Sequence, residues 1–159
     1  MRKSIYKILL CLLCFLLNCS YTDAQNKERV YALIYQQILP GGSEYCYVLK
    51  DSKIRVYKIK NNNQILKCKR SLSRVEFDSI IGQVNNILTQ NYNYTYSDSR
   101  ILDGINWSFE LSLNERKSTF KISNCKLKPF EDLLNVLNSS LPTKKRYIRM
   151  DWLNPKNCE

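Results

Sequence analysis

The chain has 159 residues, with 25 Lys and Arg against 14 Asp and Glu and no histidine. This length suits one domain with one core, and an apolar fraction of 44% excludes a chain that is disordered throughout. The lack of histidine removes the usual general base and the Ser-His and Cys-His pairs of nucleophilic catalysis. The composition therefore favours a basic binding domain over an enzyme.

The first 24 residues have the pattern of an export signal. A basic start precedes an uncharged apolar run from Ile8 to Leu17, which is too short to span a bilayer comfortably and is typical of a signal-peptide core. Cleavage after Ala24 would follow a small-x-small pattern. Cleavage before Cys19 would follow a sequence similar to a bacterial lipoprotein box, with Cys19 lipidated. An uncleaved membrane anchor is the third alternative.

The chain then divides into three parts. We expect a signal peptide over 1–24 (cleaved after 18 in the lipoprotein case), a single domain over 25–150 and a tail over 151–159. We also expect a monomer located in the periplasm or cell envelope, held at the membrane only through an anchor at Cys19.

Four cysteines follow the signal segment: Cys46, Cys68, Cys125 and Cys158. An even number in an oxidising compartment predicts one or two structural disulfides, each worth about 2–4 kcal/mol, with three pairings open. Since these four cysteines form no Cys-x-x-Cys pair and the chain has no histidine, we expect no metal and no cofactor.

The first half of the domain has the pattern of β-strands. A run from Val30 to Leu39, rich in β-branched and aromatic residues, and a second run from Tyr45 to Leu49 flank Pro40-Gly41-Gly42-Ser43, which predicts a hairpin. A helix over 30–39 is the alternative. Lys53 to Lys60 predicts a third strand, and Ile65 to Lys69 a short fourth one after an asparagine turn.

Two helices are predicted. Ser73-Arg74-Val75-Glu76 is a capping box before an apolar stripe at helical spacing, which predicts a helix over 73–89. Pro129 opens a second helix whose stripe runs from Phe130 to Leu141, and Pro142 ends it. The pattern over residues 144–149 allows an additional edge strand.

The clearest strand covers Ile105 to Leu113, where apolar and polar residues alternate for five periods. We expect it at the centre of the sheet, preceded by a long surface loop over 89–104 and followed by a strand over 118–124. The predicted fold is α+β: one antiparallel sheet of five to seven strands, with both helices packed on one face.

The stretch from Lys50 to Arg74 contains nine bases and one acid. It predicts a positive sheet face for an acidic protein or an anionic envelope component, or else a solvated face whose charges prevent edge pairing. Nucleic acid fits the charge but not the exported compartment. The candidate binding residues are Lys53, Arg55, Lys58, Lys60, Lys67, Lys69 and Arg70.

Two smaller groups could carry function. Tyr92, Tyr94 and Tyr96 alternate in a polar segment, where tyrosines suit recognition or pack back on the rim of the sheet. A group of acids, Asp98, Asp103 and Glu110, could supply paired carboxylates for hydrolysis, although acids at turns are usually solvated turn-formers.

The layout resembles small exported proteins and lipoproteins of Bacteroides-type bacteria. The features that carry the resemblance are the signal ending near Cys19 or Ala24, the Gly41-Gly42 hairpin, the Ser73-x-x-Glu76 helix and the Asp103-Gly104 strand. Since several such proteins are immunity or inhibitor proteins, the resemblance implies a non-enzymatic protein that neutralises a toxin or enzyme by binding it. The alternatives are a structural or ligand-binding envelope lipoprotein and an envelope hydrolase.

Overall fold

The computed structural model describes residues 29–38, 44–97 and 105–147. Within these ranges, seven strands form one mixed sheet, accompanied by two α-helices and a short 3-10 helix. The predicted α+β class with a single sheet is thereby confirmed. The predicted signal segment, Cys19, Asp98, Asp103, Cys158 and the tail lie outside the described ranges. No helix in the described ranges has the length and apolarity needed to cross a membrane.

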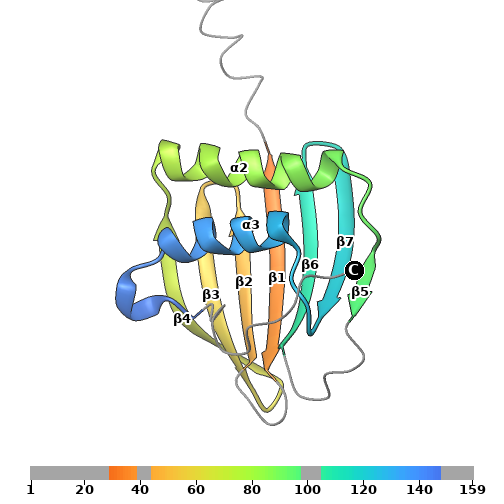
Figure 1. Ribbon diagram of the computed structural model, residues 1–159. Coiled ribbons are helices and arrows are strands. Elements are labelled where there is room, and N and C mark those ends of the chain that lie inside the picture. Colours follow the sequence, from red (N-terminus) through yellow and green to blue (C-terminus); the bar gives the residue numbers. More distant parts are fainter. Residues whose placement is uncertain (1–28, 39–43, 98–104, 148–159) are drawn as a thin grey trace, which may run out of the picture.

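The first four strands form an antiparallel meander: β1 (Val30–Ile38), β2 (Glu44–Lys50), β3 (Lys53–Lys60) and β4 (Asn63–Ser71) (Figure 1). The alternative of a helix over 30–39 is therefore wrong. Two-residue turns join β2 to β3 and β3 to β4. Asp51, Asn61 and Asn62 have positive φ angles of 52°, 50° and 61°, a backbone conformation that Asp and Asn tolerate better than most residues.

The second half of the sheet begins beside β1. β6 (Ile105–Leu113) pairs antiparallel with β1 and with β7 (Arg116–Ser123), while β5 (Thr95–Ser97) pairs parallel with β7. The strand order is β4-β3-β2-β1-β6-β7-β5. Three expectations need correction: β1 takes the centre in place of 105–113, the predicted surface loop contains a strand, and the parallel pairing of that strand with β7 makes the sheet mixed rather than antiparallel.

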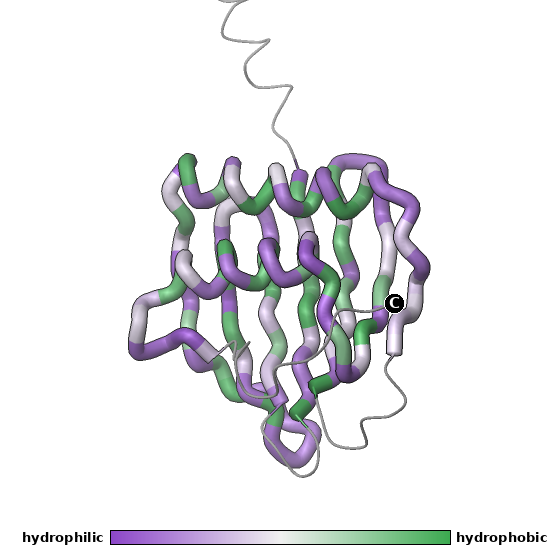
Figure 2. The backbone as a smooth tube through the Cα atoms, viewed as in Figure 1, coloured by the Kyte–Doolittle hydropathy of each residue, from purple (hydrophilic) through white to green (hydrophobic). Residues whose placement is uncertain are grey.

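Each central strand has one buried side and one half-exposed side. In β1 the buried residues are Val30, Ala32, Ile34 and Gln36, and the residues between them are only partly buried. The alternation of apolar and polar positions continues across the sheet (Figure 2). We call the side that the helices cover the helix side and the opposite side the open face.

Helix α2 (Arg74–Thr89) begins at the predicted capping box, where Ser73 Oγ accepts from the Glu76 N–H and the Glu76 carboxylate accepts from the Ser73 N–H. Helix α3 (Lys128–Ser139) has Pro129 in its first turn, as predicted. Both helices run across the strands on the same side of the sheet (Figure 1). Residues 143–145 form a 3-10 helix, η1 (Thr143–Lys145), so the edge strand predicted over 144–149 is wrong there.

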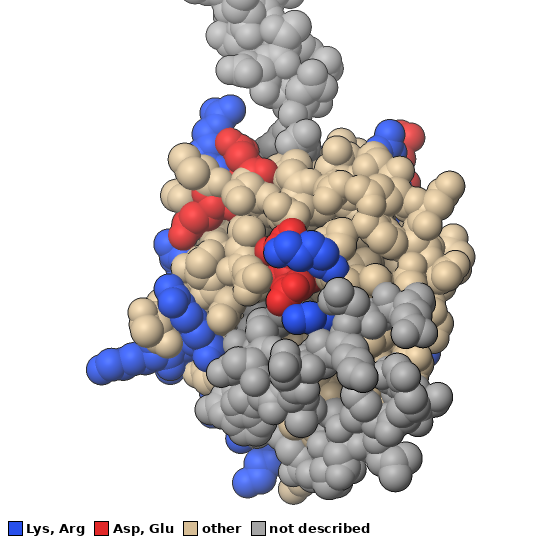
Figure 3. Space-filling model, viewed as in Figure 1, with Lys and Arg blue, Asp and Glu red and all other residues tan. Residues whose placement is uncertain are grey.

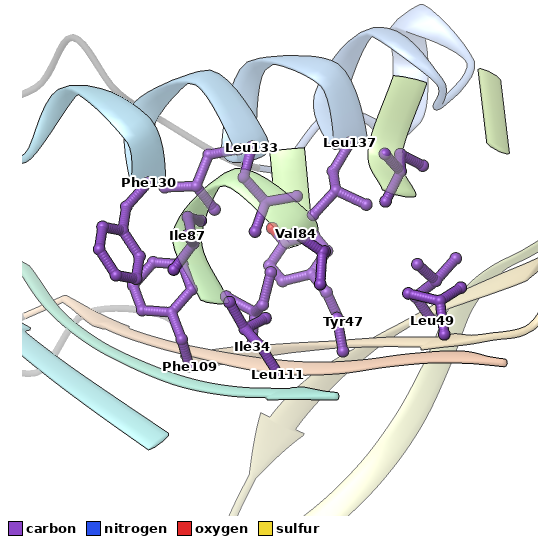
Figure 4. Close-up of a cluster of buried hydrophobic side chains, with 14 of the residues drawn as sticks. Ile34, Tyr47, Leu49, Val84, Ile87, Phe109, Leu111, Phe130, Leu133 and Leu137 are labelled. Atoms are coloured by element: carbon purple, nitrogen blue, oxygen red, sulfur yellow. The ribbon is translucent and has the colours of Figure 1, made fainter. Parts of the chain in front are cut away.

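The core lies between the helices and the sheet. Phe130 of α3 makes edge contacts with Phe109 of β6 and Phe120 of β7, with ring centroids 4.9 and 5.1 Å apart. Ile87 and Val84 of α2 point to the same layer (Figure 4). These contacts hold the first turn of α3 against β6 and β7, and the rest of the helix runs on across β1 and β2 (Figure 1). The register of the sheet determines which side chains lie on the open face.

Cys46 and Cys68 are free thiols, so the disulfides predicted at these two positions are wrong. Cys46 is opposite Tyr57 on the open face, whereas Cys68 is opposite Val56 on the helix side. Since β3 separates their strands, their Cα atoms are roughly 9–10 Å apart, which is beyond the reach of a disulfide. Cys125, in contrast, is disulfide-bonded.

Candidate functional site

The open face carries side chains from six neighbouring strands, and the pairing register arranges them in rows. One row contains Lys69, Arg55, Val48, Leu33 and Glu110. The next row contains Leu66, Tyr57, Cys46, Tyr35 and Ser108. Because paired residues of antiparallel strands share a face, these rows define a continuous surface with an apolar centre and a basic side.

The centre of the open face is unusually apolar for a side of the sheet that no described helix covers. Five half-buried residues on three neighbouring strands form this centre: Tyr31, Leu33 and Tyr35 on β1, Val48 on β2 and Tyr57 on β3. Tyrosine offers a large contact area and a hydrogen-bonding tip at small entropic cost, which suits it to binding surfaces. We call these five residues the tyrosine patch.

Hydrogen bonds hold Tyr35 of the patch in place. The Tyr35 hydroxyl donates to Glu44 Oε2 at 2.5 Å, and Gln37 Nε2 donates to Glu44 Oε1 at 3.0 Å. Burial, together with the Glu44 carboxylate, raises the pKa of Tyr35 to about 12. Burial and the nearby charge of Glu110 also raise the pKa of Tyr31. Both tyrosines are therefore neutral at physiological pH.

A basic rim borders the tyrosine patch on β2, β3 and β4. Lys50 is opposite Lys53, Arg55 is opposite Lys69, and all four side chains are exposed on the open face. Of the predicted binding residues, Lys53, Arg55 and Lys69 thus come together. Their like charges lie within a few strand spacings of one another, which produces a positive field at this side of the sheet.

The other predicted bases lie elsewhere. Lys58 is opposite Tyr45 on the helix side. Arg70 also belongs to that side and forms a 2.8 Å ion pair with Glu76 of α2. Lys60 flanks the β3–β4 turn, and Lys67 is the extra residue of a β-bulge opposite Val56 and Tyr57. The prediction of one basic face is therefore wrong for these residues, because it took no account of the bulge or of alternation.

Of the three acids that could supply carboxylates for hydrolysis, only Glu110 lies within the described ranges. Glu110 lies on the open face of β6 and forms a 2.8 Å ion pair with Lys117 of β7. The same contact raises the pKa of Lys117. Glu110 thus has a salt-bridge partner next to the tyrosine patch, and Glu44 and Glu110 place two negative charges on a face where bases predominate.

The three predicted tyrosines do not form one exposed group. The Tyr92 ring lies edge-on to Phe130, with ring centroids 5.7 Å apart, and its hydroxyl donates to Gln90. Tyr96 packs against the core and its hydroxyl accepts from the Asn93 N–H. Tyr94 alone is largely exposed, at 69%. Of the two predicted alternatives, packing back on the sheet is therefore the one that Tyr92 and Tyr96 follow.

A groove of about 690 Å³ lies between α2 and the β6–β7 turn. Asp78 and Asn85 line it from the helix, Glu115 and Arg116 from the turn. Asp78 lies 3.7 Å from Arg74 of its own helix. Within the described ranges, no three metal-ligating side chains gather anywhere. The groove therefore presents mixed charges, whereas the open face combines apolar area with charge of one dominant sign.

The helix side shows a different distribution of charge. Acidic and basic side chains are mixed over the helices, and bases follow the edge beside β4 and η1 (Figure 3).

No protein-family model matches the chain, and no curated protein matches it either.

Proposed function

We propose that this protein is an exported, non-enzymatic binding protein of the immunity or inhibitor type, which neutralises a toxin or enzyme by covering an acidic surface of it. One observation carries the proposal: the open face places the tyrosine patch directly beside the basic rim of Lys50, Lys53, Arg55 and Lys69. An aromatic centre with a charged rim has the anatomy of a protein–protein interface.

The charge of the rim favours an acidic protein as partner. Basic residues at the edge of an interface accelerate association with an acidic surface and exclude basic partners. The tyrosine patch, in turn, requires a partner with apolar area of its own, because half-buried aromatic rings gain free energy only when water is excluded from them. A protein surface supplies both, whereas a simple anionic polymer supplies only the charge.

The proposal is tested in the cells that make the protein. Deletion of the gene is expected to harm cells only when a toxin encoded nearby is active, and the full chain is expected to restore growth. The double variant Arg55→Glu and Lys69→Glu should fail to restore it and should bind the toxin at least tenfold more weakly.

A matched control reverses the same amount of charge elsewhere. Lys144 and Lys145 of η1 are exposed and lie away from the open face. Their replacement by glutamate should leave protection and affinity unchanged. Equal loss in both double variants would mean that net charge alone matters, and full protection by the Arg55 and Lys69 variant would overturn the proposal.

A further inference from the structure

We infer that the partner contributes an extended acidic segment that pairs with the edge strand β4 and lengthens the sheet by one strand. This inference rests on the proposed function, because it describes how the same partner is held. β4 ends the strand order, and within the described ranges only β3 pairs with it. Its outer backbone groups therefore form a template for a further strand.

The backbone of β4 offers specific donors and acceptors. Lys60 and Asn63 flank the two-residue turn and form a hydrogen-bonded pair, after which bonded and non-bonded pairs alternate. Gln64, opposite Ile59, and Leu66, opposite Tyr57, belong to non-bonded pairs. Their N–H and C=O groups consequently point away from β3, toward the position of an added strand.

The side chains of this edge are also left uncovered. Ile65 and Leu66 are 41% and 51% exposed, which makes them two of the four large apolar side chains exposed in the described ranges. They lie on opposite faces of β4, since Ile65 is opposite Lys58 and Leu66 is opposite Tyr57. An added strand would cover part of both, and Leu66 continues the row of the tyrosine patch to the edge.

The positive charge of this edge determines which kind of strand can pair with β4. Lys67 and Lys69 lie on β4, and Lys53 and Arg55 lie on the neighbouring strand. Lysines and bulges on an edge strand commonly prevent pairing between like copies. Here the same lysines repel a second copy of β4 and attract a strand of opposite charge, so one set of residues supplies both the rejection and the attraction that specificity needs.

The test uses a synthetic ten-residue peptide of alternating threonine and glutamate, with the threonine–lysine peptide as its matched control. With the full mature chain, the acidic peptide is expected to slow amide hydrogen exchange at Gln64 and Leu66 at least tenfold. The lysine peptide should cause no change. A fully N-methylated acidic peptide, which keeps the charge but has no backbone donors, should bind at least tenfold more weakly.

Variants of the protein give an independent measurement. Gln64→Pro removes an outward N–H without breaking a bond to β3, as proline does on an edge strand, and should weaken binding of the acidic peptide at least tenfold. Gln64→Ala should bind like the original chain. If Gln64→Pro does not fold, the N-methylated peptide decides alone.

Two results would overturn the inference. The first is equal binding of the N-methylated peptide, with slowed amide exchange confined to Arg55 and Lys69 on the open face. This result would mean that acidic chains bind by charge without strand pairing, and the proposed function would stand. Absence of any acidic-peptide binding to β4 would likewise reject strand addition, while the growth experiment would decide the proposed function separately.

Discussion

Tyr35 shows how a single side chain links the open face to its pH dependence. Its hydroxyl donates to Glu44, and its pKa is raised from 10.0 to about 12. The unfolded chain therefore releases this proton at lower pH than the folded chain. The stabilisation is complete below pH 10 and is lost as the pH rises through about 12.

We expect Tyr35→Phe to lower the free energy of unfolding by about 1 kcal/mol near pH 8, the usual net value of one hydrogen bond. Between pH 10 and 12, it should lose less stability than the original chain. Urea unfolding at a series of pH values measures both effects. Tyr94→Phe, which changes an exposed ring, is the control; identical pH profiles for Tyr35→Phe and the original chain would contradict the assignment.

Cys46 provides a second prediction at the residue scale. Cys46 is 6% exposed, and burial raises the pKa of its thiol. Since the thiolate is the reactive form, iodoacetamide should label Cys68, which is partly exposed, well before Cys46 in the native protein. Denaturation should equalise the two rates, and Cys125 should react only after reduction. Mass spectrometry of the digested protein reports each site; rapid native labelling of Cys46 would contradict its burial.

Among the elements, α3 depends on one aromatic side chain. Phe130 is buried and contacts Phe109, Phe120 and Tyr92. Phe130→Ala should destabilise the fold by about 3–5 kcal/mol, because it removes a large buried side chain and leaves a cavity. Phe130→Leu should cost less, since it refills part of the volume. Denaturant unfolding gives both values, and a loss below about 1 kcal/mol for the alanine variant would mean that α3 is held elsewhere.

Local patterns in the sequence predict most of these elements. The alternation in Ile105–Leu113, the asparagine turn before β4 and the capping box at Ser73 each depend on neighbouring residues. The strand order does not depend on neighbouring residues, because β6 pairs with β1 through contacts between residues far apart in the sequence. β5 was missed for a similar reason: its three residues become a strand only through parallel pairing with β7.

The candidate site was predicted only in part. The basic stretch indicated Lys53, Arg55 and Lys69, but a bulge at Lys67 and the alternation of β3 and β4 distribute the other bases over both sides. The tyrosine patch was not predicted. A signal for it was present in β1, where the residues between the buried positions are Tyr31, Leu33 and Tyr35 rather than polar ones.

The whole molecule is asymmetric across its sheet. One side is covered by two helices over a shared core, as Figure 4 shows for α3 and α2 above β1 and β6. The open face instead leaves half-buried tyrosines beside four exposed bases. An uncovered apolar centre would favour self-association, whereas like charges at its rim oppose it. The balance between these two effects decides the oligomeric state.

We expect the mature chain to remain monomeric at low salt, because bringing two open faces or two β4 edges together would place Arg55 and Lys69 near the same residues of a second copy. Raising the salt concentration to about 1 M shortens the screening length to about 3 Å, and should therefore permit weak dimers. Arg55→Gln with Lys69→Gln, which removes these like charges without creating new ones, should dimerise at least tenfold more strongly at low salt, whereas Lys144→Gln with Lys145→Gln should not. Sedimentation velocity measures each case. A stable dimer of the original chain at low salt, weakened by the Arg55 and Lys69 changes, would instead show that the open face is a contact between copies.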